Sequence, residues 1–380
     1  MNNEALARSG RYTRAEVDLA AFRHNVSVVA REAGGARLWA VVKADAYGHG
    51  AVACARAALA AGAEGLCVAL TQEAVELRLA GIEAPIMVLS EQPVGELDVL
   101  VRSRVVCVAY NERYISALAE ASRRAGVRTL VHMKVDTGMH RVGASPSDAG
   151  SRAKSIVESS NLVLDGVMTH LATADDPSHA ATQRQLNQFQ EVLAVVRGVA
   201  PTLRQVHVAN SAATLRHLLP ECTMVRAGIA LYGLQPGEGV AELAGKLRPV
   251  MSLRTAVGHV QRLPAGEAVS YGLRTVLERD TTVATLPIGY ADGIARRSWS
   301  TPARVLVGGK PRRIVGVVTM DQMMVDCGDD AVSVGDEAVI FGVQSGAVVR
   351  VEDWASALDT ITYEIVCAVS ARVPRVYVGG

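Results

Sequence analysis

The sequence predicts an α/β fold in which a (β/α)8 TIM-type barrel is followed by a separate, predominantly β C-terminal domain. Short apolar runs alternate with helix-like segments from about residue 38 to 235, and the rhythm then changes to β-rich runs separated by turns. With 380 residues, the chain has room for one barrel and a second module. We expect an N-terminal segment at 1–13 that pairs with the β domain, a barrel over 14–240 and the β domain over 241–380.

Eight apolar runs are the expected barrel strands. Each is short and almost continuously apolar, as is typical of parallel strands buried on both faces. They lie at 38–42, 65–70, 85–90, 105–110, 129–135, 164–170, 204–210 and 223–228. Eight strand–helix units in succession favour a closed barrel. On pattern alone, an open doubly wound sheet is the alternative.

The segments between the runs have the ends expected of helices. One amphipathic segment begins after Thr71, a candidate N-cap residue, and ends at Gly81. A second begins after Asn111 and ends at Gly126 in the same way. The opening TRAEVDL alternates like a strand, and the helical pattern AAFRHNVSVVAREAG leads from it into the barrel.

Composition argues against several classes of partner. The 39 Lys and Arg nearly balance the 38 Asp and Glu, and no basic run is present, so we expect neither a nucleic-acid nor a membrane partner. The N-terminal residues lack the apolar core of a signal peptide, which predicts a cytoplasmic protein. The six cysteines form no CxxC pair and have no histidine at ligand spacing, so we expect reduced thiols and no metal site.

Lys43 ends the first apolar run, and the carboxyl ends of barrel strands form the active-site face. An isolated lysine there is most simply a snorkelling surface residue. The surrounding WAVVKADAYGHG changes that interpretation, because it places a tyrosine and a Gly-His-Gly turn in the same strand-to-helix loop. This stretch resembles the cofactor-lysine motif of the alanine racemase family.

Further segments carry the resemblance along nearly the whole chain. They are MKVDTGMHRVG (133–143), MTHLATADD (168–176), NSAAT (210–214), VRAGIALYG (225–233), SYG (270–272), GYADG (289–293), TMDQ (319–322) and YEIV (363–366). The resemblance implies an isomerase with pyridoxal 5'-phosphate on Lys43, a head-to-tail homodimer with shared active sites, and interconversion of L- and D-alanine. It also implies a role in supplying D-alanine for peptidoglycan.

The loops after the seventh and eighth strands are where barrels often bind phosphate. The Ser211 hydroxyl and the backbone N–H groups of Gly228 and Ile229 are the expected donors there. Taken singly, these pieces are ordinary helix starts. The resemblance adds Asn210, Tyr47 and Tyr363 to the cofactor-binding set.

Arg226 is the residue that bears most on the reaction. A guanidinium has only donors, so a pyridine nitrogen facing it, as the resemblance implies, must accept and stay unprotonated. Such a ring is a weaker electron sink, which favours rapid reprotonation at Cα over transamination. The resemblance makes His170 the partner of Arg226, although a lone histidine at a strand end is more often a satisfied core residue.

Inversion at Cα requires one acid/base group on each face. The resemblance assigns Lys43 to the face that handles the D-enantiomer and Tyr271, from the partner subunit, to the L-enantiomer. Dimerisation is therefore expected to be obligatory for activity. By itself, Tyr-Gly in a β loop is more often a turn.

Alternation in TLVHMKVDTG puts His132, Lys134 and Asp136 on one side of the strand, toward the barrel interior. A buried lysine needs a partner. The resemblance implies that Lys134 is carbamylated and orients Arg141, which binds cofactor and substrate carboxylate. An ordinary Lys134–Asp136 pair is the alternative.

The resemblance also assigns the Met320 backbone N–H to the substrate carboxylate, from the partner subunit, and Tyr290 to the substrate entrance. Two positions depart from the family: Asp45 stands where relatives often have Asn, and His140 where many have Gly. Neither has an assigned chemical role.

Three other functions fit parts of the pattern. A racemase of the same family acting on serine, lysine or a broader set of amino acids shares every motif. An amino-acid decarboxylase shares the two-domain plan but characteristically places an acidic residue at the pyridine nitrogen, which Arg226 contradicts. A noncatalytic pyridoxal-phosphate carrier resembles the barrel alone and lacks the β domain.

Overall fold

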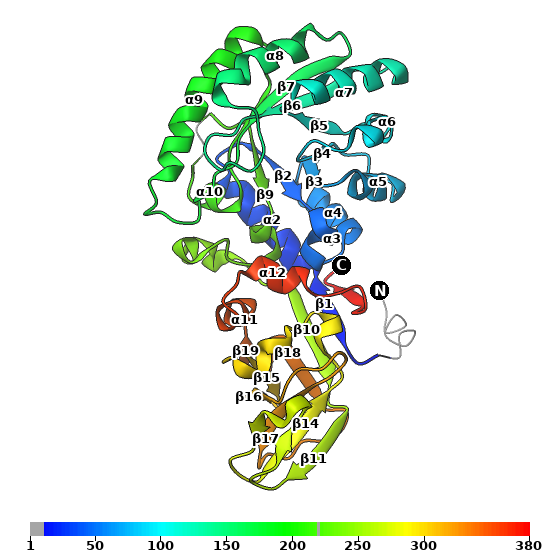
Figure 1. Cartoon of the computed structure of the whole chain (residues 1–380), viewed down its shortest axis with the longest axis vertical. Helices are drawn as coiled ribbons and strands as arrows, with labels where there is room; N and C mark the ends of the chain where they lie inside the picture. The colour runs from blue at the N-terminus through cyan, green and yellow to red at the C-terminus, as the bar shows by residue number, and fades with distance from the viewer. Residues whose placement is uncertain (1–10, 219–220) are drawn as a thin grey trace. The chain divides into compact units, whose positions relative to one another are not determined.

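The computed structural model describes residues 11–218 and 221–380 and divides into two compact units (Figure 1). The barrel unit comprises Phe22–Ala46 and Ala51–Leu247, and the β unit comprises, of the described residues, Arg11–Ala21, Tyr47–Gly50 and Arg248–Gly380. The predicted boundaries differ mainly in that residues 14–21 and 47–50 belong to the β unit. Of the expected segment 1–13, residues 1–10 lie outside the described residues.

The barrel unit contains eight parallel strands in the sheet order β8-β7-β6-β5-β4-β3-β2-β9. They are β2 (Arg37–Val41), β3 (Gly65–Val68), β4 (Ile86–Val88), β5 (Val106–Ala109), β6 (Thr129–Lys134), β7 (Leu162–Met168), β8 (Gln205–His207) and β9 (Met224–Ala227). Each coincides with one of the eight apolar runs, which confirms the strand predictions.

The two end strands of this order lie side by side. The Thr223 N–H donates to the Val206 carbonyl at 2.9 Å, and the Arg226 N–H donates to the Ala209 carbonyl at 3.0 Å. These bonds join the β8 segment to the β9 segment and exclude the open sheet. The barrel prediction is therefore confirmed.

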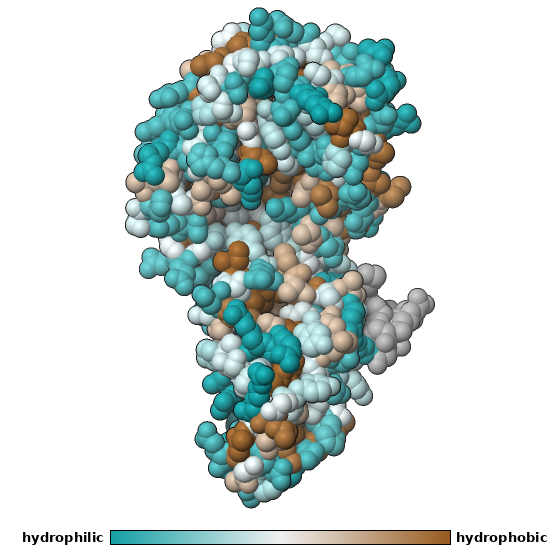
Figure 2. All heavy atoms as spheres, in the orientation of Figure 1, coloured by the Kyte–Doolittle hydropathy of each residue, from teal (hydrophilic) through white to brown (hydrophobic). Residues whose placement is uncertain are grey.

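Helices cover the outside of the barrel strands (Figure 1). They are α2 (Leu19–Glu32), α4 (Ala51–Ala60), α5 (Thr71–Leu79), α6 (Leu97–Arg102), α7 (Glu112–Ala125), α8 (Ala149–Glu158), α9 (Ala181–Val199) and α10 (Ser211–Leu215). The short element α3 (Lys43–Gly48) follows β2 and passes from the barrel unit into the β unit. Their visible outer surface is mainly hydrophilic, with some apolar side chains over α5 and α6 (Figure 2).

Helix ends were predicted correctly for α7 and incorrectly for α5. The Asn111 side chain accepts the N–H of Arg113, and Gly126 ends α7 with a φ of 66°. Thr71, in contrast, is the first helical residue of α5 rather than its N-cap, and its hydroxyl donates to the Gln92 side chain at 3.3 Å. The backbone N–H groups of Ala69 and Leu70, just before α5, are instead bound by the Glu73 side chain.

The β unit is built on a large sheet in the order β11-β14-β17-β16-β15-β18-β10-β1-β20, with β19 paired to β18, and a separate pair β12-β13. The strands are β1 (Arg14–Asp18), β10 (Met251–Ala256), β11 (His259–Leu263), β12 (Ala268–Val269), β13 (Thr275–Val276), β14 (Thr281–Leu286), β15 (Arg304–Val307), β16 (Lys310–Val315), β17 (Met323–Gly328), β18 (Glu337–Gln344), β19 (Ala347–Val349) and β20 (Arg375–Val378). Two helices accompany them, α11 (Val351–Ala357) and α12 (Thr362–Cys367).

The strand expected in TRAEVDL is β1, which pairs antiparallel with β10 and parallel with β20. The strand that pairs with the C-terminal sheet therefore lies at Arg14–Asp18, in residues that the predicted boundaries had assigned to the barrel. No helix in the described part of the chain has the length and apolarity needed to cross a bilayer.

Candidate active site

The residues expected to carry chemistry form two sets, one in each unit. The barrel unit holds Lys43, Lys134, Arg141, His170, Asn210, Ser211, Arg226, Gly228 and Ile229, and the β unit holds Tyr47, Tyr271, Tyr290, Met320 and Tyr363. In the barrel unit they follow or end strands β2, β6, β7, β8 and β9. Parallel strands present their carboxyl ends on one face, so these side chains collect at the same mouth.

A left-handed turn follows Lys43. Ala44, Asp45, Ala46 and Tyr47 have φ values of 51°, 51°, 52° and 53°. L-residues enter this region at about 1–2 kcal/mol each, and normally singly rather than in a run. A run of four is held only if the surroundings bind it firmly.

Glu73 in α5 supplies part of that restraint, and the sequence analysis missed it. One carboxylate oxygen accepts the N–H of Ala44 at 2.6 Å, and the other accepts the N–H groups of Ala69 and Leu70 at 2.7 and 3.0 Å. The carboxylate thus caps α5 and ties the turn after Lys43 to it. A glutamate at the third position of a helix was the available signal.

Asp45 contributes on the other side of the turn. Its carboxylate accepts the N–H of Ala51 at 2.7 Å, at the first residue of α4. An asparagine oxygen can accept the same bond, so either residue would support the start of the helix.

Arg226 is buried in β9 and bound through both terminal nitrogens. Nη1 donates to Nδ1 of His207 at 2.7 Å and to the His207 carbonyl at 3.1 Å. Nη2 donates to the Thr169 carbonyl at 2.9 Å and lies 3.4 Å from Nδ1 of His170. Among the described residues no acceptor meets its Nε–H, which leaves that donor for a ligand.

His170 fits the role of a neutral neighbour. Burial, followed by the charge of Arg226, lowers the pKa of His170 well below 6.5. A neutral ring can accept from a guanidinium, whereas an imidazolium cannot. The expected His170–Arg226 contact is present, but His207 makes the shorter bond.

The loops after β8 and β9 meet at Ser211. Its hydroxyl oxygen accepts the N–H of Gly228 at 2.9 Å and lies 3.4 Å from the N–H of Ala230. Asn210 is the N-cap of α10, and its side chain accepts the N–H of Ala213 at 3.0 Å. A hydroxyl and several backbone N–H groups are therefore brought together, as an anion cradle requires.

Lys134 is buried among cations. Burial, and then the charges of Arg226, Arg141 and Lys43, lower the pKa of Lys134 from 10.5 to about 8. Within the described residues no carboxylate forms an ion pair with it, so the alternative of a Lys134–Asp136 pair is wrong.

Asp136 instead shapes the loop that carries Arg141. One carboxylate oxygen accepts the N–H groups of Gly138, Met139 and His140 at 3.0, 3.0 and 2.9 Å. His140 has a φ of 56°, in the region that favours glycine. Arg141 itself is exposed.

In the β unit, the expected catalytic residue Tyr271 lines a cavity. Tyr271 and Thr319, the neighbour of Met320, line a cavity of about 460 Å³. The Tyr290 N–H donates to the Thr319 carbonyl and the Ala291 N–H to the Met320 carbonyl, each at 3.0 Å. The SYG, GYADG and TMDQ segments are therefore assembled on the same part of the β unit, and Tyr271 and Met320 are exposed there.

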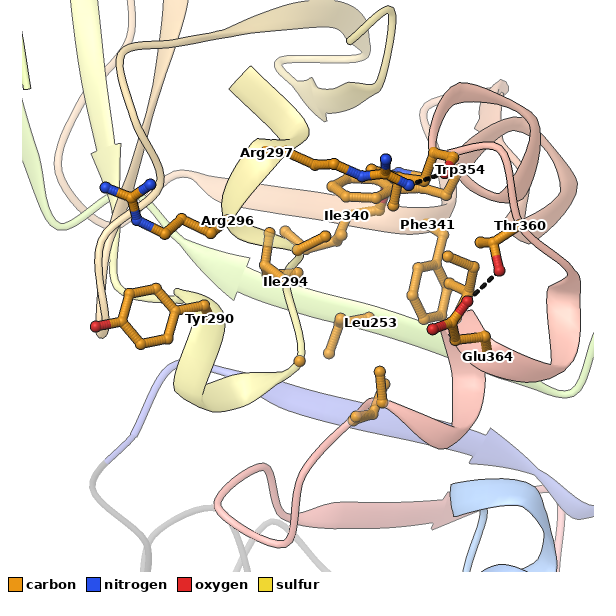
Figure 3. Close-up of a pocket in the computed structure, with 16 residues that line it drawn as sticks. Leu253, Tyr290, Ile294, Arg296, Arg297, Ile340, Phe341, Trp354, Thr360 and Glu364 are labelled. Atoms are coloured by element: carbon orange, nitrogen blue, oxygen red, sulfur yellow. Dashed lines mark hydrogen bonds between the residues drawn. The ribbon is translucent and has the colours of Figure 1, made fainter. Parts of the chain in front are cut away.

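Tyr290 borders a second cavity of the β unit, of about 390 Å³. Figure 3 shows Tyr290 and Arg296 at one side of it and Glu364 at the other, with Ile294 and Phe341 between them. Leu253, Ile340 and Trp354 add further apolar side chains to the lining, and the Tyr290 hydroxyl points away from them.

Tyr47 and Tyr363 lie close together in the β unit, with ring centroids 5.9 Å apart. Gly48 follows with a φ of 79°, and a Cβ there would lie 2.5 Å from the Val366 carbonyl oxygen. Only glycine allows so close an approach of the turn to α12. The two tyrosines expected to bind one phosphate are thus neighbours.

Comparison with known proteins agrees with this arrangement. Residues 17–236 match the model of the alanine racemase N-terminal domain and residues 250–377 that of the C-terminal domain. The chain belongs to the alanine racemase family. One match falls mostly on the barrel unit and the other on the β unit, so the family assignment covers both.

Individual relatives extend over nearly the full chain. An alanine racemase of Symbiobacterium thermophilum is 45% identical over 97% of this chain and 98% of its own. One of Thermobifida fusca is 42% identical over 97% and 98%. The solved alanine racemase of Streptomyces coelicolor A3(2) superimposes with a TM-score of 0.94 at 40% identity, covering 98% of this chain and 100% of its own.

Proposed function

We propose that the protein interconverts L- and D-alanine with pyridoxal 5'-phosphate carried on Lys43. The observation that carries this proposal is the buried Arg226, whose two terminal nitrogens are bound to the barrel while no acceptor among the described residues meets its Nε–H. A donor-only group in that place suits an unprotonated pyridine nitrogen. Family membership over both units supports the assignment.

The residues present fit this cofactor. Ser211 offers a hydroxyl hydrogen and Ile229 a backbone N–H to a phosphate, and the Gly228 N–H joins them when a phosphate replaces the Ser211 oxygen as its acceptor. Asn210 holds the helix start beside them, and Tyr47 and Tyr363 offer two neighbouring phenols. Lys43 supplies the amine that carries the cofactor. When bound, pyridoxal phosphate supplies the electron sink that makes the Cα proton of an amino acid acidic.

Two groups of this chain move the proton. Nζ of Lys43 takes it from or returns it to one face of Cα, and the hydroxyl of Tyr271 does so on the other face. Because Tyr271 lies exposed in the β unit, we propose that it serves the partner subunit of a homodimer, together with the Met320 backbone N–H. Arg141 and that N–H bind the substrate carboxylate, and Tyr290 restricts the size of substrates that enter.

Lys134 is proposed to be carbamylated. With a pKa of about 8, its amine is neutral in about a tenth of molecules at pH 7, far more than for an ordinary lysine. The Nζ lone pair attacks the carbon of CO2, a new N–C bond forms, one C–O π bond opens, and the amine proton passes to solvent. The resulting anion sits among Arg226, Arg141 and Lys43, which removes the repulsion of a fourth cation and orients Arg141.

We propose that the enzyme acts in the cytoplasm and that its D-alanine is used for peptidoglycan. The test is incorporation of deuterium from D2O at Cα of L- and D-alanine, with serine as a competing substrate. Rapid exchange into both alanine enantiomers, and much slower exchange into serine, is the expected result. Absence of exchange in purified protein loaded with pyridoxal phosphate would refute the proposal.

Attachment of the cofactor is tested separately. Loaded protein should absorb near the border of the visible and ultraviolet through the lysine-bound cofactor, and Lys43→Ala should lose this band. A band retained in Lys43→Ala would show that another residue carries the cofactor.

A further inference from the structure

A chain of buried polar side chains runs through the barrel interior behind Arg226. His207 in β8 meets His132 in β6, with Nε2 of His207 2.8 Å from Nδ1 of His132. Nε2 of His132 lies 3.3 Å from the carboxylate of Asp165 in β7. Arg204, exposed just before β8, donates from Nε to the other carboxylate oxygen at 2.5 Å. The chain therefore extends from an exposed ion pair to the arginine expected to face the cofactor.

Arg226 determines which atom is the donor in each hydrogen bond of this chain. A guanidinium has no acceptor, so Nδ1 of His207 must accept and its proton must be on Nε2. Nε2–H of His207 then donates to His132, whose proton is in turn on its own Nε2. That nitrogen donates to Asp165, an acceptor at both oxygens. One direction of bonding satisfies all the groups.

Protonation states agree with this direction. Burial lowers the pKa of both His132 and His207 below 6.5, so both rings are neutral at physiological pH. Burial opposes ionisation of Asp165, but hydrogen bonds from His132 and Arg204 outweigh it and lower its pKa. The chain thus begins with a cation, passes through two neutral rings and ends at an anion.

The barrel is shaped to hold these rings. The β6–β7 register shifts between Val131 and His132, so that Asp165 is the extra residue of a β-bulge. The next residue, Gly166, leaves the space for His132, because a Cβ there would lie 2.8 Å from Cγ of His132 and 2.9 Å from Cβ of Gln205. The two imidazole rings pack with centroids 4.9 Å apart.

We propose that Asp165, His132 and His207 are positioning residues that fix the tautomer of His207 and so hold Arg226 with its Nε–H directed to the cofactor ring. This inference rests on the proposed function for its consequence, but its proton positions stand independently of activity. The alternative tautomer of His207 would place an N–H against the Nη1–H of Arg226 at 2.7 Å and push the guanidinium out of place.

Proton positions are tested by neutron diffraction from crystals of the perdeuterated holoenzyme. Deuterium on Nε2 and not on Nδ1 of both His207 and His132 is the expected result. Deuterium on Nδ1 of either ring would overturn the proposal. This outcome is separate from failure of the proposed function, which would leave the wild-type protein without Cα exchange.

Consequences for the reaction are tested with three variants. His207→Leu removes the acceptor and should lower kcat about 10- to 100-fold, while His207→Gln, whose carbonyl can accept from Arg226, should recover at least part of the loss. Thr129→Val, in the same strand as His132, breaks a buried hydroxyl pair with Ser122 that does not reach Arg226, and should leave kcat within about twofold of wild type. Equal losses in His207→Leu and Thr129→Val would contradict the positioning role.

Discussion

The restraint of the left-handed turn by Glu73 can be removed by one substitution. In Glu73→Ala, the N–H of Ala44 loses a carboxylate partner at 2.6 Å, and the N–H groups of Ala69 and Leu70 lose theirs. Hydrogen bonds to a charged group contribute about 1.5–3 kcal/mol each. Ala44 and Leu70 are exposed, so hydrogen bonds to water replace part of the lost interaction energy. We therefore expect the free energy that stabilises the turn to fall by about 2–3 kcal/mol.

Hydrogen–deuterium exchange measured by mass spectrometry on a peptide covering residues 42–50 reports this local stability. A loss of 2–3 kcal/mol corresponds to about 30- to 140-fold faster exchange of the amides that become protected when the turn forms. The affinity for pyridoxal phosphate should fall as well, because Lys43 precedes the turn and Tyr47 ends it.

Glu76→Ala is the matched control, since Glu76 is an exposed glutamate of the same helix for which no side-chain bond is found within the described residues. It should leave exchange in 42–50 unchanged. Unaltered exchange in Glu73→Ala, or equal acceleration in both variants, would refute the argument that this carboxylate holds the turn.

Three further predictions concern other residues. In protein depleted of CO2, the free energy of unfolding should rise between pH 8 and 10, because folded Lys134 releases its proton near pH 8 and the unfolded side chain only near 10.5. Urea titrations should show this rise in the wild-type protein and not in Lys134→Met. If the unfolding free energies of the two proteins change in parallel with pH, Lys134 is not the group responsible. Tyr271→Phe should retain the cofactor but slow proton removal from L-alanine in single-turnover measurements, whereas equal slowing with both enantiomers would argue against a two-base mechanism. Gly166→Ala should lower the free energy of unfolding by about 1–3 kcal/mol through overlap with His132, and an unchanged unfolding midpoint would mean that the ring has room to move.

The parts of the fold that were predictable have local causes. Parallel strands buried on both faces must be apolar throughout, so eight apolar runs identified eight strands. The ends of α7 follow from Asn111 and Gly126 because both caps act on neighbouring backbone. The cap of α5 was mistaken because Glu73 accepts from Ala69 and Leu70 and also from Ala44, 29 residues earlier.

The candidate site divides in the same way. Motifs around Lys43, Arg226 and Tyr271 are contiguous in sequence and carry the resemblance to the family, so they could be found without coordinates. His207 and Asp165 could not, since each is an unremarkable residue in its own strand. Only the register that sets Gly166 opposite His132 shows that they form one chain.

By itself, the sequence determined the order of strands and helices, the separate β domain, the family and the lysine expected to carry the cofactor. These depend on side-chain periodicity and on short motifs. The tertiary structure decided which donors of Arg226 are bound, which nitrogens of the two histidines face each other, that Lys134 lies near three cations without forming an ion pair in the described residues, and that a left-handed turn follows Lys43. Each of these is set by groups from different strands and helices, whose distances no local pattern encodes.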